Sequence, residues 1–317
     1  MIQVDRLTKR YGSFKAVDGI TFSVGRGEIV GLLGPNGAGK TTTMRVLTTF
    51  LGPTSGRATL AGHDVLDEPL EVRRRVGYLP ENVPLYLEMR VREYLLYRAK
   101  LKDVPRSRRR AAINEVIARC QLGDVEERIL GHLSKGYRQR VGLAESMVHD
   151  PDILILDEPT AGLDPIQIRE VRALIRELGD RHTILLSTHI MSEVEAVCGR
   201  VIIIARGKIA VDDRLDRLRS ESSIILEARG PADAMRRGLE IIPGVEHVVQ
   251  SRLEGEYATF EIHTKNGSDL REELAQRVVQ NGWPLRQLDI RRTTLEDRFI
   301  QAVTRETISA EAELEAV

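Results

Sequence analysis

A glycine-rich segment, Gly34-Pro-Asn-Gly-Ala-Gly-Lys-Thr41, constrains this chain more than any other feature of its sequence. It directly follows an apolar run, EIVGLL, and precedes a predicted helix, which is the setting that a phosphate-binding loop requires. Glycines let successive backbone N–H groups turn toward phosphate oxygens, and the helix adds the positive end of its dipole. The residues predicted to bind phosphate are Gly34, Pro35, Asn36, Gly37, Ala38, Gly39, Lys40, Thr41 and Thr42.

Two residues of this loop and two distant carboxylates predict the chemistry. Lys40 is expected to reach the β and γ phosphates of a nucleotide, and the Thr41 hydroxyl to ligate Mg²⁺. The segment ILILDEPT places Asp157 and Glu158 at the end of an apolar strand. Open α/β sheets bind their ligands at the carboxyl ends of their strands. Asp157 is expected to hold the Mg²⁺ shell, and Glu158 to polarise the water that attacks the γ-phosphate.

The pattern of apolar residues predicts an α/β fold. Continuous apolar runs at 153–156, 183–186 and 201–204 alternate with helical stretches, which indicates a parallel sheet buried on both faces. Residues 85–149 show helical periodicity and are predicted to form a helical insert. Asp164 is expected to cap the helix that begins at Pro165, because it can accept backbone N–H groups there.

A charged stretch, DDRLDRLRSESS, marks a predicted domain boundary near residue 220. Just before it, Arg206-Gly207 is expected to turn the chain into a closing hairpin. Beyond it, the strand and helix signals follow a βαββαβ order, which predicts a small α+β module. The expected domains are therefore residues 1–219 and 220–317.

Composition excludes several classes of protein. Lys plus Arg and Asp plus Glu both number 47, so no overall basic field favours nucleic acid as a partner. No apolar run approaches the roughly 20 residues needed to cross a bilayer, and no secretory signal is visible. Cys120 and Cys198 cannot form a disulfide framework or a zinc site and are interpreted as buried hydrophobic residues.

The cluster Arg106, Arg108, Arg109 and Arg110 is interpreted as a solvated helix start, with an anion or lipid contact as the alternative.

Four segments in a fixed order make the resemblance to a known family specific. After the phosphate loop come LSKGYRQR at 133–140, the ILILDEPT strand, AGLD at 161–164, and His189 after another strand. Over roughly residues 1–220 the sequence resembles the ATP-binding cassette (ABC) ATPases. The resemblance implies a P-loop NTPase fold, with a RecA-like core and antiparallel β and helical subdomains.

The resemblance also implies a dimer that binds ATP. Ser134 and Gly136 would contact the γ-phosphate of ATP held by the opposite subunit, so the partner is a second copy of this chain. Asp164 would belong to the loop that crosses this interface. His189 would touch the γ-phosphate and position the water, and Tyr11 would stack on adenine.

Two segments depart from the family pattern. LSKGYRQR at 133–140 stands in the place of the family's signature motif and is called the signature segment below. In it, Lys135 replaces a glycine and Tyr137 replaces a glutamine, but the serine and second glycine remain. Glu81, in GYLPE, stands where the family generally has a glutamine that reports the γ-phosphate state. A carboxylate can accept from a metal-bound water, so Glu81 is expected near the Mg²⁺, but it cannot donate a hydrogen bond as an amide does. Coupling or Mg²⁺ dependence is therefore expected to differ.

Within the family, GYLPE, LSKGYRQR and the tail TTLEDRFIQAV are similar to bacterial ATPase subunits that pair with separately encoded ABC-2-type permeases. The gliding-motility-associated and nitrous-oxide-reductase-maturation ATPases are similar in these segments. The resemblance implies a cytoplasmic protein, peripheral on the inner face of the cell membrane. The alternative is a soluble ABC ATPase acting on nucleic acid or ribosomes, but neither a long coiled coil nor a second cassette is present.

Overall fold

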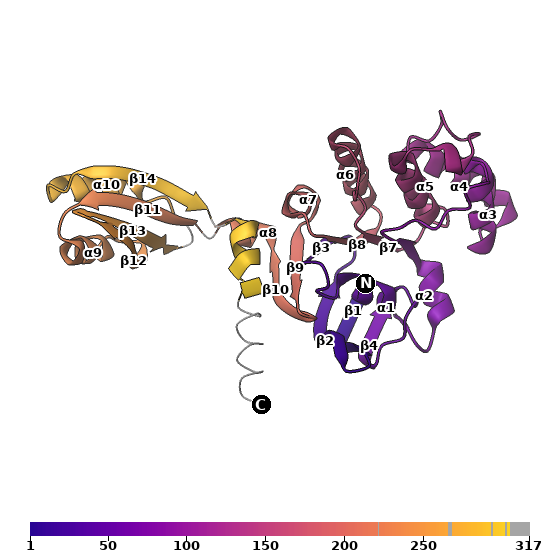
Figure 1. Ribbon diagram of the computed structural model, residues 1–317, viewed down its shortest axis with the longest axis horizontal. Helices are drawn as coiled ribbons and strands as arrows, with labels where there is room; N and C mark the ends of the chain where they lie inside the picture. The colour runs from indigo at the N-terminus through magenta and orange to yellow at the C-terminus, as the bar shows by residue number, and fades with distance from the viewer. Residues whose placement is uncertain (221, 266–267, 293, 302, 305–317) are drawn as a thin grey trace. The chain divides into compact units, whose positions relative to one another are not determined.

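The computed structural model describes residues 1–304 except 221, 266–267, 293 and 302 (Figure 1). Its contacts divide the chain into two compact units. The first comprises Met1–Asp213 with the described residues between Phe299 and Thr304, and the second comprises Arg214–Arg298. The contacts divide the chain between Asp213 and Arg214, where strand β10 ends, whereas the expected boundary at 219/220 falls six residues later, at the end of helix α8 (Leu215–Ser220).

The first unit begins with a four-stranded antiparallel sheet. Its strands, in spatial order, are β2 (Phe14–Val24), β1 (Ile2–Tyr11), β4 (Ser55–Leu60) and β5 (His63–Asp64). Buried and exposed residues alternate over the first part of β1, so one face of the sheet is apolar. This face packs on helix α1 (Lys40–Leu47) and on one side of the second sheet.

The second sheet has six strands and is buried on both faces. Its spatial order is β10 (Lys208–Arg214), β9 (Arg200–Ala205), β3 (Ile29–Leu33), β8 (Thr183–Thr188), β7 (Ile153–Asp157) and β6 (Val76–Leu79). The five strands from β9 to β6 pair in parallel. On β7, Ile153 and Ile155 join the core shared with α1, whereas Leu154 and Leu156 join the core on the opposite face. The predicted parallel sheet is thus confirmed.

Strands β9 and β10 form the predicted closing hairpin. Arg206 and Gly207 connect them with φ angles of 49° and 79°. Two consecutive positive φ angles are typical of the type I′ turn, whose twist matches that of the flanking strands.

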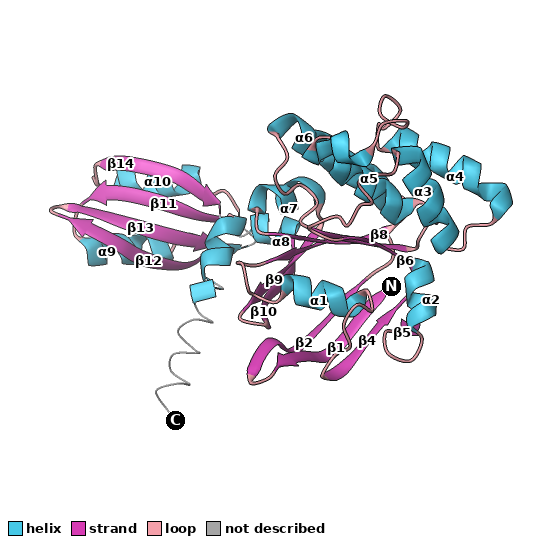
Figure 2. Cartoon of the chain, turned by 45° about the vertical axis from the view of Figure 1, so that its right-hand side comes forward, coloured by secondary structure: helices cyan, strands magenta, loops and turns pink. Residues whose placement is uncertain are grey.

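Helices cover both faces of the parallel sheet (Figure 2). Helices α1 and α2 (Pro69–Arg75) contribute to the core below it, and α6 (Pro165–Gly179) to the core above it. Asp164 caps α6 as predicted, because its Oδ1 accepts the N–H groups of Ile166 and Gln167, each at 3.0 Å. Helix α7 (Met191–Val197) packs against α6, β3 and β8.

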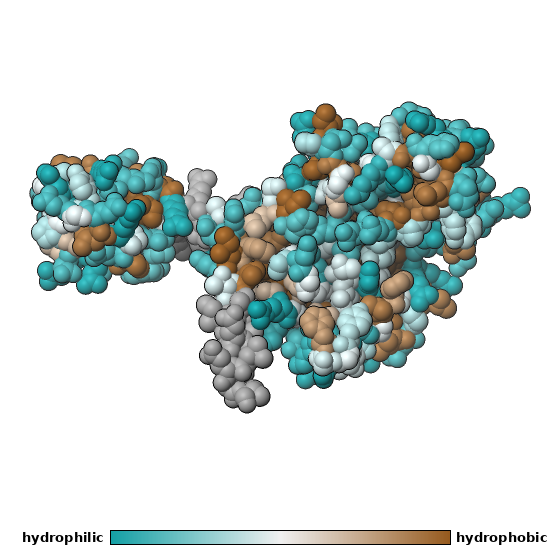
Figure 3. Space-filling view, in the orientation of Figure 1, coloured by the Kyte–Doolittle hydropathy of each residue, from teal (hydrophilic) through white to brown (hydrophobic). Residues whose placement is uncertain are grey.

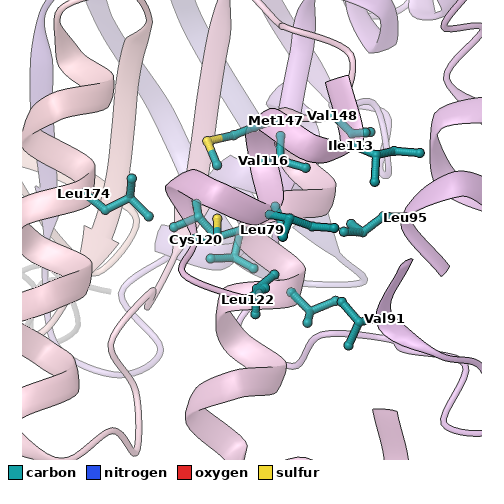
Figure 4. Close-up of a cluster of buried hydrophobic side chains, with 14 of the residues drawn as sticks. Leu79, Val91, Leu95, Ile113, Val116, Cys120, Leu122, Met147, Val148 and Leu174 are labelled. Atoms are coloured by element: carbon teal, nitrogen blue, oxygen red, sulfur yellow. The ribbon is translucent and has the colours of Figure 1, made fainter. Parts of the chain in front are cut away.

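The predicted helical insert contains α3 (Val91–Leu101), α4 (Arg106–Arg119), the 3₁₀ turn η1 (Leu130–His132) and α5 (Lys135–Met147). Its apolar side chains and those of the sheet form one core (Figure 4). Cys120 lies inside this core, and burial raises the pKa of its thiol to about 12, as expected for a structural residue. Among the described residues, no helix combines the length and apolar character needed to span a membrane.

The second unit is an antiparallel sheet with two helices. The sheet has the order β12 (Val245–Glu254), β13 (Tyr257–Thr264), β11 (Ser222–Arg229) and β14 (Leu285–Arg292). Helices α9 (Ala232–Glu240) and α10 (Arg271–Gln280) share one apolar core with it. The elements follow the predicted βαββαβ order.

Candidate functional site

The loop between β3 and α1 is shaped by its glycines. A side chain at Gly34 would clash with the carbonyl oxygen of Ile204, and a Cβ atom at Gly39 would lie 2.5 Å from that of Ala16. Gly39 also has a φ of 110°, which only glycine adopts readily. Helix α1 begins at Lys40 and has no acidic residue in its first turn. The N–H groups of the first turn of α1 and the positive end of its dipole therefore face the space that the loop encloses.

The Lys40 side chain is buried and turns back into this loop. Its ammonium group donates to the Gly34 carbonyl oxygen at 2.7 Å and lies 3.8 Å from Glu158 Oε1. Burial lowers the pKa of Lys40, while the carboxylates of Glu158, Asp157 and Glu81 act in the opposite direction. The ammonium group is thus placed inside the loop, where phosphate oxygens would be received.

Asp157 lies at the end of β7, next to the start of α1. The Thr41 hydroxyl donates to Asp157 Oδ1 at 3.4 Å, and the Ser187 hydroxyl donates to the same oxygen. Within the described part of the chain, Asp157 Oδ2 is buried and has no hydrogen-bond partner. A free carboxylate oxygen beside a hydroxyl fits Mg²⁺, which prefers oxygen ligands. Among the residues described, no group of three or more His, Cys, Asp or Glu side chains is placed to hold a metal ion.

Glu158 is held in a strained conformation. Its φ is 49°, in the left-handed region that residues other than glycine seldom adopt. Its N–H donates to two atoms of Ser187, the carbonyl oxygen at 3.1 Å and Oγ at 3.2 Å. His189 Nδ1 lies 3.0 Å from both oxygens of the Glu158 carboxylate. Strain that neighbouring strands hold in place is typical of catalytic residues.

These groups surround a cavity of about 540 Å³. The predicted residues that line it are Tyr11, Asn36, Gly37, Ala38, Gly39, Lys40, Thr41, Thr42, Glu81, Glu158 and His189. Gly34 and Pro35 accept hydrogen bonds from Lys40, and Asp157 accepts one from Thr41, so these three lie directly behind the lining. The fold therefore brings the two predicted halves of the site together.

Two aromatic side chains stand at one side of the cavity. Tyr11 and Phe14 pair across the turn between β1 and β2, and both line the cavity. They are 48% and 62% exposed. Such rings offer flat surfaces on which a nucleotide base can stack.

Comparison with known proteins agrees with this geometry. The family model described as ABC transporter matches residues 17–161. The bacitracin transport ATP-binding protein BcrA of Bacillus licheniformis is 34% identical over 316 residues, which cover 97% of this chain and 99% of that protein. The chain belongs to the ATP-binding proteins of ABC transporters.

Other relatives of this ABC ATPase match over similar lengths. The daunorubicin resistance ATP-binding protein DrrA3 of Streptomyces coeruleorubidus is 34% identical over 307 residues, which cover 94% of each chain. A solved structure of the ATP-binding subunit of an ABC transporter has a TM-score of 0.64 and 30% identity, and covers 69% of this chain and 92% of that one. The expected family, fold class and ATPase activity are confirmed.

The signature segment of this ABC ATPase lies apart from the phosphate loop. Ser134 caps α5, because its Oγ accepts the N–H of Tyr137 at 3.4 Å. Gly136 is buried, and a side chain there would clash with Gln167. Neither Ser134 nor Gly136 lines the cavity that holds Lys40 and Glu158. A single subunit therefore does not bring these two predicted phosphate contacts to its own loop.

The two replacements in the signature segment make contacts within the chain. The Lys135 side chain packs over Gly162 in the AGLD segment, where any Cβ atom would clash with it. The Tyr137 hydroxyl donates to Asp124 at 2.6 Å, and this hydrogen bond raises the pKa of Tyr137. The signature segment thus contacts the AGLD segment.

Ser187 and Phe14 belong to the site but were not predicted from the sequence, and the same holds for Ala16 and Ala161 in the cavity lining. Ser187 holds both Asp157 and the Glu158 backbone, and Phe14 lines the cavity beside Tyr11. A polar residue at the end of the apolar run TILLST was the available signal for Ser187. For Phe14 the signal was a second aromatic residue three positions after Tyr11.

Proposed function

We propose that this ABC ATPase works as a homodimer that binds ATP with Mg²⁺ and drives a separately encoded ABC-2-type permease. The convergence of Lys40, Asp157, Glu158 and His189 on one cavity carries the proposal. The relatives named for bacitracin transport and daunorubicin resistance support an exporter. The protein would then lie on the inner face of the cell membrane.

Three residues would hold the metal ion. The Thr41 hydroxyl and the free Oδ2 of Asp157 are suitable oxygen ligands, and Glu81 lines the same cavity. Mg²⁺, when bound, neutralises charge on the β and γ phosphoryl oxygens. Glu81 would accept a hydrogen bond from a metal-bound water, where an amide could also donate one.

The remaining groups would position the phosphates and the attacking water. Lys40 binds the β and γ phosphates as a cation held inside the loop. The Glu158 carboxylate accepts the proton of the water that attacks the γ-phosphate in line. His189 orients that carboxylate through Nδ1, and Tyr11 stacks on the adenine.

A second subunit would complete each nucleotide site. Ser134 and Gly136 lie at the N-terminus of the 13-residue helix α5, a position that favours anions. Because neither residue lines its own subunit's cavity, we assign them to the γ-phosphate bound by the partner. Asp164, which caps α6 within one chain, would lie at the same interface.

A second cavity offers a place for the permease. It has a volume of about 750 Å³ and begins at Pro80 and Asn82, the two neighbours of Glu81. A segment seated there would touch the same loop that carries Glu81 to the nucleotide. Residues at the opposite side come from α3 and α5 of the helical insert. Movement of the insert on ATP binding would thus reach the permease.

The charges of this second cavity indicate an acidic occupant. Its lining carries four cations and one carboxylate, namely Arg45, Arg73, Arg98, Lys102 and Glu145. Glu145 is already paired with Arg98 and accepts a hydrogen bond from Tyr94 at 2.5 Å. Arg98 Nε is buried and has no partner within the residues described. A permease segment with an acidic side chain would supply it.

The dimer can be tested without the permease. Glu158→Gln should bind ATP but fail to hydrolyse it, so light scattering should show twice the 35.6 kDa of one chain when ATP and Mg²⁺ are added. Adding Ser134→Ala to that variant should abolish the ATP-dependent dimer, and Lys40→Ala should not bind or turn over nucleotide. Normal hydrolysis by Glu158→Gln, or full activity of a monomer that is unaffected by Ser134→Ala, would refute the mechanism.

The membrane partner requires a second experiment. The tagged protein, purified from native membranes in mild detergent, should retain an integral membrane protein. Recovery of ribosomes or DNA in its place would favour the soluble ABC ATPase considered above.

A further inference from the structure

The first five residues of α4 include four arginines that the proposed ATPase cycle does not use: Arg106, Arg108, Arg109 and Arg110. Arg109 donates to the carbonyl oxygen of Val104 at 2.8 Å. The other three are exposed, and none of the four forms an ion pair with a carboxylate among the described residues. Figure 3 shows hydrophilic side chains projecting from the outer edge of the helical insert.

This arrangement is unfavourable for the isolated protein. Positive charges at a helix N-terminus oppose the helix dipole, and like charges three or four residues apart repel each other. No acidic residue in the first turn of α4 offsets these effects. An anionic surface outside the chain would offset both.

The excess positive charge is also local. Residues 69–119 contain 13 Lys and Arg against 6 Asp and Glu, although the whole chain has 47 of each kind. An anion attracted to this protein is therefore attracted to α2, α3 and α4 rather than to its surface in general.

The position of the cluster relates it to the membrane. Helices α3 and α4 lie side by side (Figure 2), and Lys102, between them, lines the cavity assigned to the permease. Arg106 follows four residues later, so its Cα lies within about 14 Å of that of Lys102. The exposed Leu101 adds an apolar side chain at the same turn. A permease segment seated in the cavity would bring this turn toward the bilayer.

We propose that the arginine cluster binds the anionic headgroups of the membrane in which the permease is embedded. This inference rests on the proposed function, because only a membrane partner brings the helical insert to a bilayer. At about 100° per residue, Arg106 and Arg110 lie on the same side of the helix and Arg108 on the other, so the three exposed arginines do not converge on one small ligand. A surface of many phosphates matches such a spread, and each guanidinium group can bind phosphate oxygens in a bidentate manner.

The test uses the full-length protein and phosphatidylcholine vesicles, with and without phosphatidylglycerol. Flotation at low salt should show binding only when phosphatidylglycerol is present. The variant Arg106→Gln/Arg108→Gln/Arg110→Gln should bind about 100-fold more weakly, which corresponds to about 1 kcal/mol for each arginine. A matched control, Arg26→Gln/Arg236→Gln/Arg237→Gln, removes the same charge from exposed positions elsewhere and should bind as the wild type does.

Several outcomes would overturn the inference. They are equal binding to both kinds of vesicle, no binding to either, or an equal loss in the two triple variants. Competition by inorganic phosphate at constant ionic strength would indicate a phosphate site instead, and retention on RNA without vesicle binding would indicate a nucleic-acid surface. The triple variant combined with Glu158→Gln should still dimerise with ATP in solution, so failure of the lipid contact is distinguished from failure of the proposed function.

Discussion

The Ser187→Ala substitution tests whether Asp157 and Glu158 are held in position by Ser187, which does not line the nucleotide cavity. Ser187 is fully buried on β8. Its hydroxyl donates to Asp157 Oδ1 and accepts the N–H of Glu158 at 3.2 Å. The substitution removes both bonds without changing the backbone of the strand.

The expected cost follows from the charge of the partners. A hydrogen bond to a charged group contributes about 1.5–3 kcal/mol. The Glu158 N–H retains the Ser187 carbonyl oxygen at 3.1 Å, so the second bond adds little. The free energy of unfolding should fall by about 2 kcal/mol. Because Asp157 keeps only the 3.4 Å contact with Thr41, the Mg²⁺ concentration for half-maximal ATPase activity should rise by about 10–100-fold, as for other residues that orient metal ligands.

The measurements are urea unfolding and ATPase activity against free Mg²⁺. Ser223→Ala is a matched control in the second unit, where the buried Ser223 hydroxyl donates to Glu261 at 2.7 Å. Trp283, the single tryptophan, packs on the core of that unit. Its fluorescence should therefore report the loss of stability in Ser223→Ala. Circular dichroism follows the whole chain and should report the loss in Ser187→Ala.

The two effects of Ser187→Ala must appear together. Ser223→Ala should lower stability and leave the Mg²⁺ dependence unchanged. If Ser187→Ala is destabilised to the same degree yet has the wild-type Mg²⁺ dependence, Ser187 is structural only. The assignment of Asp157 to the metal would then lose its support from this hydrogen bond.

Two further predictions concern stability. Burial lowers the pKa of His149 to about 3, and its Nε2 lies 3.2 Å from the Val76 carbonyl oxygen. Between about pH 3 and pH 6.5, the unfolded chain binds a proton at this histidine that the folded chain does not. The contribution of His149 to the free energy of unfolding therefore falls with pH, by up to about 1.4 kcal/mol per pH unit. Urea midpoints measured at several pH values should fall less steeply in His149→Gln. Asp164→Ala should lower the free energy of unfolding by about 1 kcal/mol because both N-cap bonds are lost, whereas Asp164→Asn should retain most of it in the same urea assay.

The parts of the site that could be predicted from the sequence depend on local patterns. Glycines before Lys40, an apolar run before Asp157 and an aspartate before Pro165 each specify a short stretch of backbone whose neighbours follow in the sequence. Apolar strands beside helices require a parallel sheet, and a parallel sheet places the carboxyl ends of β3 and β7 together. The meeting of the phosphate loop with Asp157 is a consequence of that topology.

The parts that could not be predicted depend on contacts between distant residues. The pairing of β7 with β8 places Asp157 opposite Ser187, and nothing in TILLST specifies that register. The positive φ of Glu158 is likewise held by β8 rather than by its own neighbours. Arg98, Glu145 and Tyr94 meet because α3 packs on α5, which the periodicity of each helix alone does not reveal.

The balance of charge in the cavity predicts that nucleotide binding depends on a divalent cation. Lys40 is the ammonium group of the cavity, and its neighbours Asp157, Glu158 and Glu81 are carboxylates that stabilise its charged form against burial. Ionised together, these groups carry a net negative charge, which would repel a triphosphate that arrives alone. A divalent cation at Asp157 Oδ2 and Thr41 would cancel that negative charge. The requirement is stricter with Glu81 than with a glutamine, because the carboxylate adds one of the negative charges. The Glu81→Gln substitution should therefore weaken the dependence of ATP binding on Mg²⁺, and an unchanged dependence would show that Glu81 lies outside the field felt by the phosphates.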